Sequence, residues 1–145
     1  MKKINYPQFI ESLHSTAKKA EWKIFYEKES DSLYWTETPF PSHAKLAKVA
    51  KEIYFFLNNT GKVGGLMIQP FQNNFVSHNE EMEKIKEFFN QKTKDDVITM
   101  SMKRKEFDPM IATLTATIKK DIYKDASDAK YTVEDLSKFL VSSSK

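Results

Sequence analysis

Apolar side chains follow two different periods along the first part of the chain. Between residues 7 and 20 they recur at spacings of three and four, with Pro7 in the first turn, a pattern that predicts an amphipathic helix. The segments 22–28 and 32–37 are instead rich in aromatic and β-branched residues, and they flank the short polar turn 29–31. Such segments predict a β-hairpin.

The middle of the chain alternates between helical and strand-like patterns. Ser42 stands at the N-cap position of a segment whose apolar residues fall three and four apart, which predicts a helix that ends near residues 58–61. The apolar run 62–69 predicts a short buried strand. Ser77 and Glu80 have the spacing of a capping box, so we expect a further helix to begin behind them.

The C-terminal part contains one ambiguous segment. Residues 97–102 predict another strand, whereas 110–123 fits both a strand of period two and a helix. The helix is favoured there because the helical spacing continues through Ile122. A last helix is expected after Thr132, followed by a frayed tail.

These elements predict a single α/β domain that spans residues 1–145, with 1–21 as an N-terminal helical extension. Strand–helix–strand units imply parallel pairing through right-handed crossovers. We therefore expect a mixed sheet of about four strands, with the N-terminal hairpin at its edge and helices packed on it.

The composition is that of an ordinary globular protein, with 40% hydrophobic and 30% charged residues among 145. No apolar run approaches the roughly 20 residues of a membrane-spanning helix, and the N-terminus lacks the apolar core of a signal peptide. The absence of cysteine excludes disulfides, thiolate metal sites and cysteine nucleophiles. These features favour a cytoplasmic protein without a membrane partner.

The formal net charge of +3 is mild for a nucleic-acid-binding protein. Lys45, Lys48 and Lys51 nevertheless recur every three residues on the outer side of the second predicted helix. This stripe is a solvated face, a surface for an acidic protein partner, or the contact surface of a small nucleic-acid-binding protein. Arg104 is the only arginine, and arginine is the side chain best suited to bidentate phosphate contacts, so nucleic acid is the second choice.

No residues have the spacing of a known catalytic or metal site. His14, His43 and His78 are the only histidines, and none belongs to an HExxH-like pattern. We expect His43 and His78 to face solvent at helix starts. A hydrolase that uses either one is the remaining enzymatic alternative, although no nucleophile accompanies them. The sequence thus predicts no catalytic residues, no metal and no cofactor.

Two smaller features allow more than one interpretation. Glu27, Glu29 and Asp31 share one side of the hairpin turn and could hold a cation, but a solvated turn is favoured. Gly64 and Gly65 in the strand 62–69 indicate either the close approach of a neighbouring helix or a bulge, or a ligand pocket. The close approach or the bulge is favoured.

Aromatic residues are concentrated in the hairpin and at its exit. Side chains alternate along a strand, so Tyr34 and Trp35 are expected on opposite faces and both faces carry rings. Either the chain covers both faces or one face binds a partner. We take Tyr34, Trp35 and Phe40, together with the lysine stripe, as candidate partner-binding residues.

The stretch 24–44 resembles the N-terminal signature of the SiaC-type regulatory phosphoproteins. That family joins a hairpin I-x-F-D-x-E-x-x-x-L-x-I to a helix entry S-Y-P-E-N-A. The positions in register are Ile24, Tyr26, Glu27, Glu29, Leu33, Trp35, Phe40, Pro41 and Ala44. Glu37 stands where the family has glycine. Its phosphorylated motif N-T-S-S falls near Ser77 if a short insertion is allowed, and on Asn73 otherwise.

The resemblance implies a STAS-like fold and a protein that is not an enzyme. Members of that family are phosphorylated by a partner kinase, dephosphorylated by a phosphatase, and bind an effector in one state. We therefore expect a regulatory or protein-interaction domain whose partner is such a pair or a signalling enzyme, with homodimerisation open. Ser77 is the candidate phosphosite, since the start of a helix favours added negative charge.

Overall fold

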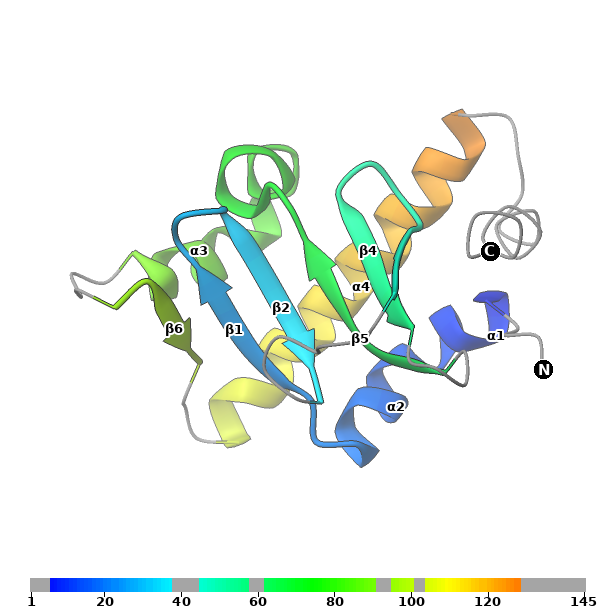
Figure 1. Ribbon diagram of the computed structural model, residues 1–145, viewed down its shortest axis with the longest axis horizontal. Helices are drawn as coiled ribbons and strands as arrows, with labels where there is room; N and C mark the ends of the chain where they lie inside the picture. Colours follow the sequence, from blue (N-terminus) through cyan, green and yellow to red (C-terminus); the bar gives the residue numbers. More distant parts are fainter. Residues whose placement is uncertain (1–5, 38–44, 58–61, 91–94, 101–103, 129–145) are drawn as a thin grey trace.

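The computed structural model describes most of the chain, namely residues 6–37, 45–57, 62–90, 95–100 and 104–128. The strands in this part are β1 (Lys23–Glu27), β2 (Ser32–Thr36), β3 (Lys45–Lys48), β4 (Ile53–Leu57), β5 (Val63–Ile68) and β6 (Val97–Thr99). They form a six-stranded sheet in the order β3-β4-β5-β2-β1-β6 (Figure 1). Every pair of neighbouring strands is antiparallel.

Helices pack against one face of this sheet. They are α1 (Tyr6–Glu11), α2 (Leu13–Lys19), α3 (Glu83–Phe89) and α4 (Arg104–Asp128), and short π and 3-10 turns occupy much of the segment Phe71–Met82. Phe9 of α1 contacts the ring of Phe55, and Phe89 of α3 stacks on Tyr26. The long helix α4 passes behind the strands in Figure 1. The result is an α/β domain with the helices on one side.

The core lies between the sheet and these helices. Leu33 and Trp35 of β2 alternate inward, and Trp35 packs edge-to-face on Trp22 with the ring centroids 5.6 Å apart. Leu114, Ile118 and Ile122 of α4 are fully buried against the same core. Their spacing is the one that favoured a helix over 110–123, and the helix is confirmed.

Other predictions from the pattern are also confirmed. The hairpin forms with Lys23 opposite Thr36. The segment 62–69 contains β5, and 97–102 contains the shorter β6. The N-terminal helix exists but is interrupted at Ser12, which separates α1 from α2. The helix expected after Thr132 lies outside the described residues.

The helix predicted to follow Ser42 is wrong within the described part, where residues 45–48 and 53–57 are the strands β3 and β4. The segment Ile53–Leu57 is β-branched and aromatic, and it buries every second side chain. Its pairing on both sides, with β3 and β5, decides the structure. Leu46, Val49 and Phe56 have the spacing of a helix, but they lie on two strands and in the tight turn that joins them.

The expected sheet is also corrected. It has six antiparallel strands instead of about four in mixed directions. A helix at residues 45–57 would make β5 follow a parallel crossover, but β3, β4 and β5 instead form an antiparallel meander. The hairpin is not at the edge either, since β6 pairs with β1 and β5 pairs with β2.

The capping box at Ser77 is not formed. Ser77 lies inside a 3-10 turn, and its hydroxyl donates to the carbonyl oxygen of Asn74 at 2.6 Å. The helix α3 begins only at Glu83, without a side-chain cap. Several tight turns therefore intervene where the sequence predicted one helix start.

Gly65 marks the close approach that the sequence favoured. A Cβ atom at Gly65 would lie 2.5 Å from Cγ2 and 2.8 Å from Cα of Thr36 on the neighbouring strand β2. Nothing lies within 4 Å of a Cβ at Gly64. The neighbour is a strand and not the expected helix, while the irregular pairing of β4 with β5 between Phe56 and Leu57 agrees with the expected bulge.

Candidate functional site

One face of the sheet has no helix over it within the described residues, and it carries bulky side chains. Because side chains alternate along a strand, the neighbours of the core residues point to this side. They are Phe25, Tyr34, Leu46, Tyr54, Phe56 and Met67, which we call the outer face. An antiparallel sheet with a free face normally carries polar residues there.

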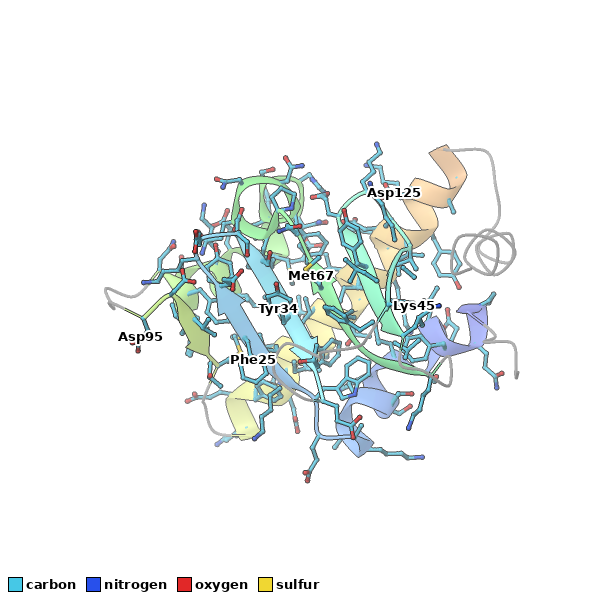
Figure 2. All side chains as sticks on the ribbon, in the orientation of Figure 1. Phe25, Tyr34, Lys45, Met67, Asp95 and Asp125 are labelled. Atoms are coloured by element: carbon cyan, nitrogen blue, oxygen red, sulfur yellow. The ribbon has the colours of Figure 1, made fainter. Side chains whose placement is uncertain are left out.

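Cross-strand pairing makes the outer face continuous. Tyr34 lies opposite Phe25 on β1 and opposite Met67 on β5, and Figure 2 looks onto these three residues. The Tyr34 ring stacks on that of Phe56 with centroids 6.1 Å apart. Leu46 lies opposite Phe56 on the edge strand and is 49% exposed. Phe25 and Met67 are each only 6% exposed, so the accessible part runs from β2 to β3.

The charges of this face lie at its corners. Lys48 on β3 holds its ammonium nitrogen 5.9 Å from the centre of the Tyr54 ring, a cation–π arrangement. Lys23 on β1 is exposed at the opposite side of the sheet. Glu27 accepts a hydrogen bond from the hydroxyl of Ser30. The outer face thus has an apolar centre with a lysine on each side and the carboxylate of Glu27 beside Tyr34.

The candidate aromatic residues are separated by the structure. Tyr34 lies on the outer face and is partly exposed. Trp35 is only 1% exposed and belongs to the core, so it is not part of a partner-binding surface. Its side chain lines a cavity of about 520 Å³, and His14 lines the same cavity. Phe40 lies outside the described residues, as does His43.

The lysine stripe does not exist as predicted. Lys45 and Lys48 lie on β3 with an odd offset, which places them on opposite faces of the strand. Lys51 lies in the turn before β4, and its backbone N–H donates to a carboxylate oxygen of Asp125 at 2.8 Å. Side chains spaced three residues apart lie on one face of a helix, whereas on this hairpin they point in different directions.

A second arrangement brings polar residues together at the other side of the molecule, beside α4. The imidazole Nε2 of His78 lies 3.0 Å from Oε1 of Glu52 and 3.3 Å from Oδ2 of Asp121. Glu52 comes from the turn before β4, His78 from a 3-10 turn and Asp121 from α4. We call Glu52, His78, Asn79 and Asp121 the histidine–carboxylate cluster.

The turn that carries His78 is anchored by the hairpin. The carboxylate of Asp31 accepts hydrogen bonds from the backbone N–H groups of Gln72 and Asn73 at 2.8 and 2.9 Å. Its Oδ1 also accepts from the hydroxyl of Tyr26 at 2.6 Å. Asp31 is therefore a structural anchor for the segment that leads to His78, and the solvated turn expected there is incorrect for this residue.

Burial sets the electrostatics of the cluster. Glu52 and Asp121 are each 6% exposed, whereas the side chain of His78 is 46% exposed. Burial raises the pKa of Glu52; the nearby carboxylates of Asp121 and Asp125 act in the same direction, and His78 opposes them. The amide nitrogen of Asn79 donates to Oδ2 of Asp121 at 2.9 Å.

A cavity of about 380 Å³ opens beside the cluster. It is lined by Lys51, Glu52, Pro70, Asn74, His78, Asp121, Lys124 and Asp125. No serine or threonine hydroxyl is among these described residues, so the hydrolase alternative finds a histidine here without an adjacent hydroxyl nucleophile. Sequence reasoning missed the cluster because its members come from separate segments and have no short-range spacing. It placed His78 at a helix start facing solvent.

Comparison with known protein families finds no match, and searches of curated proteins and of solved structures find no significant similarity. Among the helices that the structure describes, none has the length and apolar character needed to cross a membrane. The outer face and the histidine–carboxylate cluster therefore have to be interpreted from their own geometry.

Proposed function

We propose that this chain is a cytoplasmic, non-enzymatic protein-interaction domain that binds an acidic protein partner on its outer face. The observation that carries the proposal is the continuous set of aromatic and aliphatic side chains on a sheet face without a covering helix in the described part. Exposed apolar patches of this kind mark interaction sites in soluble proteins.

The composition of the outer face fits a protein ligand. Tyrosine, phenylalanine and methionine are the residues that the centres of protein interfaces favour. Tyr34, Tyr54 and Phe56 present partly exposed rings, and Leu46 adds an exposed aliphatic side chain. Lys23 and Lys48 stand on either side of this apolar centre, and they favour carboxylates on the partner.

The proposed surface can be tested by comparing two charge substitutions. Leu46→Glu places a negative charge in the outer face, and Tyr123→Glu places one at an exposed site on α4. The purified chain is immobilised and exposed to native lysate. We expect the wild type and Tyr123→Glu to retain one or more proteins, and Leu46→Glu to retain at least tenfold less of them. Quantitative mass spectrometry of the bound fraction measures this, and the identified partner should be acidic.

Two outcomes would contradict the proposal. The first is equal retention by Leu46→Glu and Tyr123→Glu, with both variants folded by circular dichroism. The second is a concentration-dependent dimer of the wild type, detected by analytical ultracentrifugation, that Leu46→Glu dissociates. That result would assign the outer face to a second copy of this chain.

Regulation by phosphorylation is a second proposal, and it follows the resemblance to the SiaC-type proteins and their STAS-like fold. Ser77 supports it by its exposure and by a hydroxyl that donates only to the backbone of Asn74 among the described residues. A phosphate there would add about −1.5 to −2 charges. We expect a mass increase of one phosphate on incubation with native lysate and ATP, absent in Ser77→Ala. Intact-mass spectra without it would remove Ser77 as the switch.

A further inference from the structure

We propose that Glu52, His78 and Asp121 form a binding site for one divalent transition-metal ion of the type of Zn²⁺ or Mn²⁺. One ligand atom from each of the three side chains lies within 4.8 Å of the others. The site is independent of the outer face, because it lies beside α4 at the turn before β4.

The two separations that involve His78 fit a shared ion, and the Glu52 and Asp121 oxygen atoms lie within 4.8 Å of each other. Zinc binds imidazole nitrogen and carboxylate oxygen at about 2.0–2.2 Å. Two ligands at tetrahedral or octahedral angles around such an ion are then about 3.0–3.4 Å apart. Nε2 of His78 lies 3.0 Å from the Glu52 oxygen and 3.3 Å from the Asp121 oxygen.

Unsatisfied oxygen atoms provide an independent argument. Oε2 of Glu52 and Oδ1 of Asn79 are buried and accept no hydrogen bond from the described residues. Glu52 is 6% exposed and Asn79 only 1%. Native proteins leave few buried polar atoms without a partner, and Oε2 belongs to the carboxylate group that already faces His78. A cation bound by this carboxylate would remove the deficit at Glu52.

The two buried carboxylates favour a bound cation. Glu52 and Asp121 bring two carboxylates out of water around one imidazole, and a buried charge is costly unless it is paired or coordinates a metal. Lys51, Lys124 and Asp125 also line the cavity, but the carboxylate atoms of the cluster face His78. A divalent ion offsets both carboxylates and leaves the imidazole neutral, which is the form that binds metals.

The surroundings resemble those of known metal sites in two respects. Asn79 donates from its amide nitrogen to Oδ2 of Asp121 at 2.9 Å and to the carbonyl of Phe75 at 2.9 Å, so it fixes the direction of the Asp121 carboxylate. The cavity of about 380 Å³ and the exposed edge of His78 give an ion access from solvent. Three protein ligands leave coordination positions open toward this cavity.

The ligand types select the class of metal. Imidazole suits zinc, iron, nickel and copper, whereas calcium and magnesium prefer sites made of oxygen atoms alone. The two carboxylates and the absence of cysteine from the chain favour zinc or manganese over copper(I). Mg²⁺ and Ca²⁺ are therefore expected to bind at least tenfold more weakly than Zn²⁺.

The test is isothermal titration calorimetry of the full chain with Zn²⁺ and Mn²⁺, and with Mg²⁺ and Ca²⁺ for comparison. We expect one Zn²⁺ or Mn²⁺ per chain. The substitutions His78→Gln and Asp121→Asn should each weaken this binding at least tenfold. The matched control His14→Gln should leave it unchanged within twofold, since His14 lies on α2 and belongs neither to the cluster nor to the lining of its cavity.

A thermal shift of the wild type keeps the test decisive if a variant fails to fold. Saturating Zn²⁺ or Mn²⁺ should raise its Tm, because an ion that binds only the folded state stabilises it. The proposal is overturned if neither ion binds the wild type below about 1 mM, a limit that corresponds to only about 4 kcal/mol of binding, with no change in Tm. It is also overturned if binding survives His78→Gln and Asp121→Asn or is lost with His14→Gln. In each of these cases the cluster is an ion pair only.

Discussion

Gly64 and Gly65 are neighbours in β5, yet the space around their Cα atoms differs. Gly65 lies opposite Thr36 of β2 and opposite Phe56 of β4, in the middle of the sheet. Thr36 is fully buried and approaches Gly65 so closely that no Cβ fits between them. Gly64 lies at the irregularity between the pairs Phe56–Gly65 and Leu57–Val63, and no atom lies within 4 Å of a Cβ there. The two residues therefore form a matched pair for measuring the close contact of β5 with β2.

Gly65→Ala should lower the free energy of unfolding by about 1–3 kcal/mol, because the added methyl group overpacks a site that has no room. Gly64→Ala should change it by less than about 1 kcal/mol in either direction, since its Cβ meets no atom and the unfolded chain loses entropy. Urea unfolding of both variants measures the difference. Equal effects would mean that Thr36 does not constrain position 65.

At the scale of elements, Glu81 connects the turn before α3 to the long helix α4. Its Oε1 accepts hydrogen bonds from Nζ of Lys120 at 2.7 Å and from the hydroxyl of Thr117 at 3.1 Å. The bond from Lys120, with smaller contributions from other hydrogen bonds, lowers the pKa of Glu81 below its usual value of 4.5. Both partners are substantially exposed, so solvent weakens the ion pair.

Glu81→Gln should lower the free energy of unfolding at pH 7 by about 0.5 kcal/mol, the size expected for an exposed ion pair. A carboxylate with a lowered pKa stabilises the fold above its unfolded pKa, and this contribution is lost as the pH falls through the folded pKa. The difference between wild type and Glu81→Gln should therefore shrink as the pH falls below 4.5 and through the lowered folded pKa, as measured by urea unfolding across pH. A difference that grows on acidification would contradict the pairing with Lys120.

Elements stabilised by local interactions were predictable, and elements decided by distant pairing were not. The segment 110–123 fitted both periods, and the apolar ladder Leu114, Ile118 and Ile122 favoured the helix, which satisfies its own backbone hydrogen bonds. The β3–β4 hairpin was missed because its strands are fixed by partners distant in the sequence, and Leu46, Val49 and Ile53 also fit a helix. Tyr34 and Trp35 were placed correctly on opposite faces, but which face lies in the core depends on where the helices pack.

At the scale of the whole molecule, the arrangement of the layers separates the two candidate sites. All the helices in the described ranges contact the core side of the sheet, which leaves the outer face without a helix. The histidine–carboxylate cluster instead forms where the β3–β4 turn and a 3-10 turn meet α4. Neither site has a local signature, because the residues of each are assembled by the sheet order and by the packing of α4.

Site-specific photo-crosslinking tests the outer face most directly. A photoreactive phenylalanine analogue replaces either Leu46 on β3 or Tyr123 on α4, in cells that naturally contain the protein. Position 46 should crosslink to a different protein through a segment rich in aspartate and glutamate, and position 123 should not. Crosslinks of equal yield from both positions, none from either, or crosslinks from position 46 only to a second copy of this chain would contradict binding of an acidic partner at this surface.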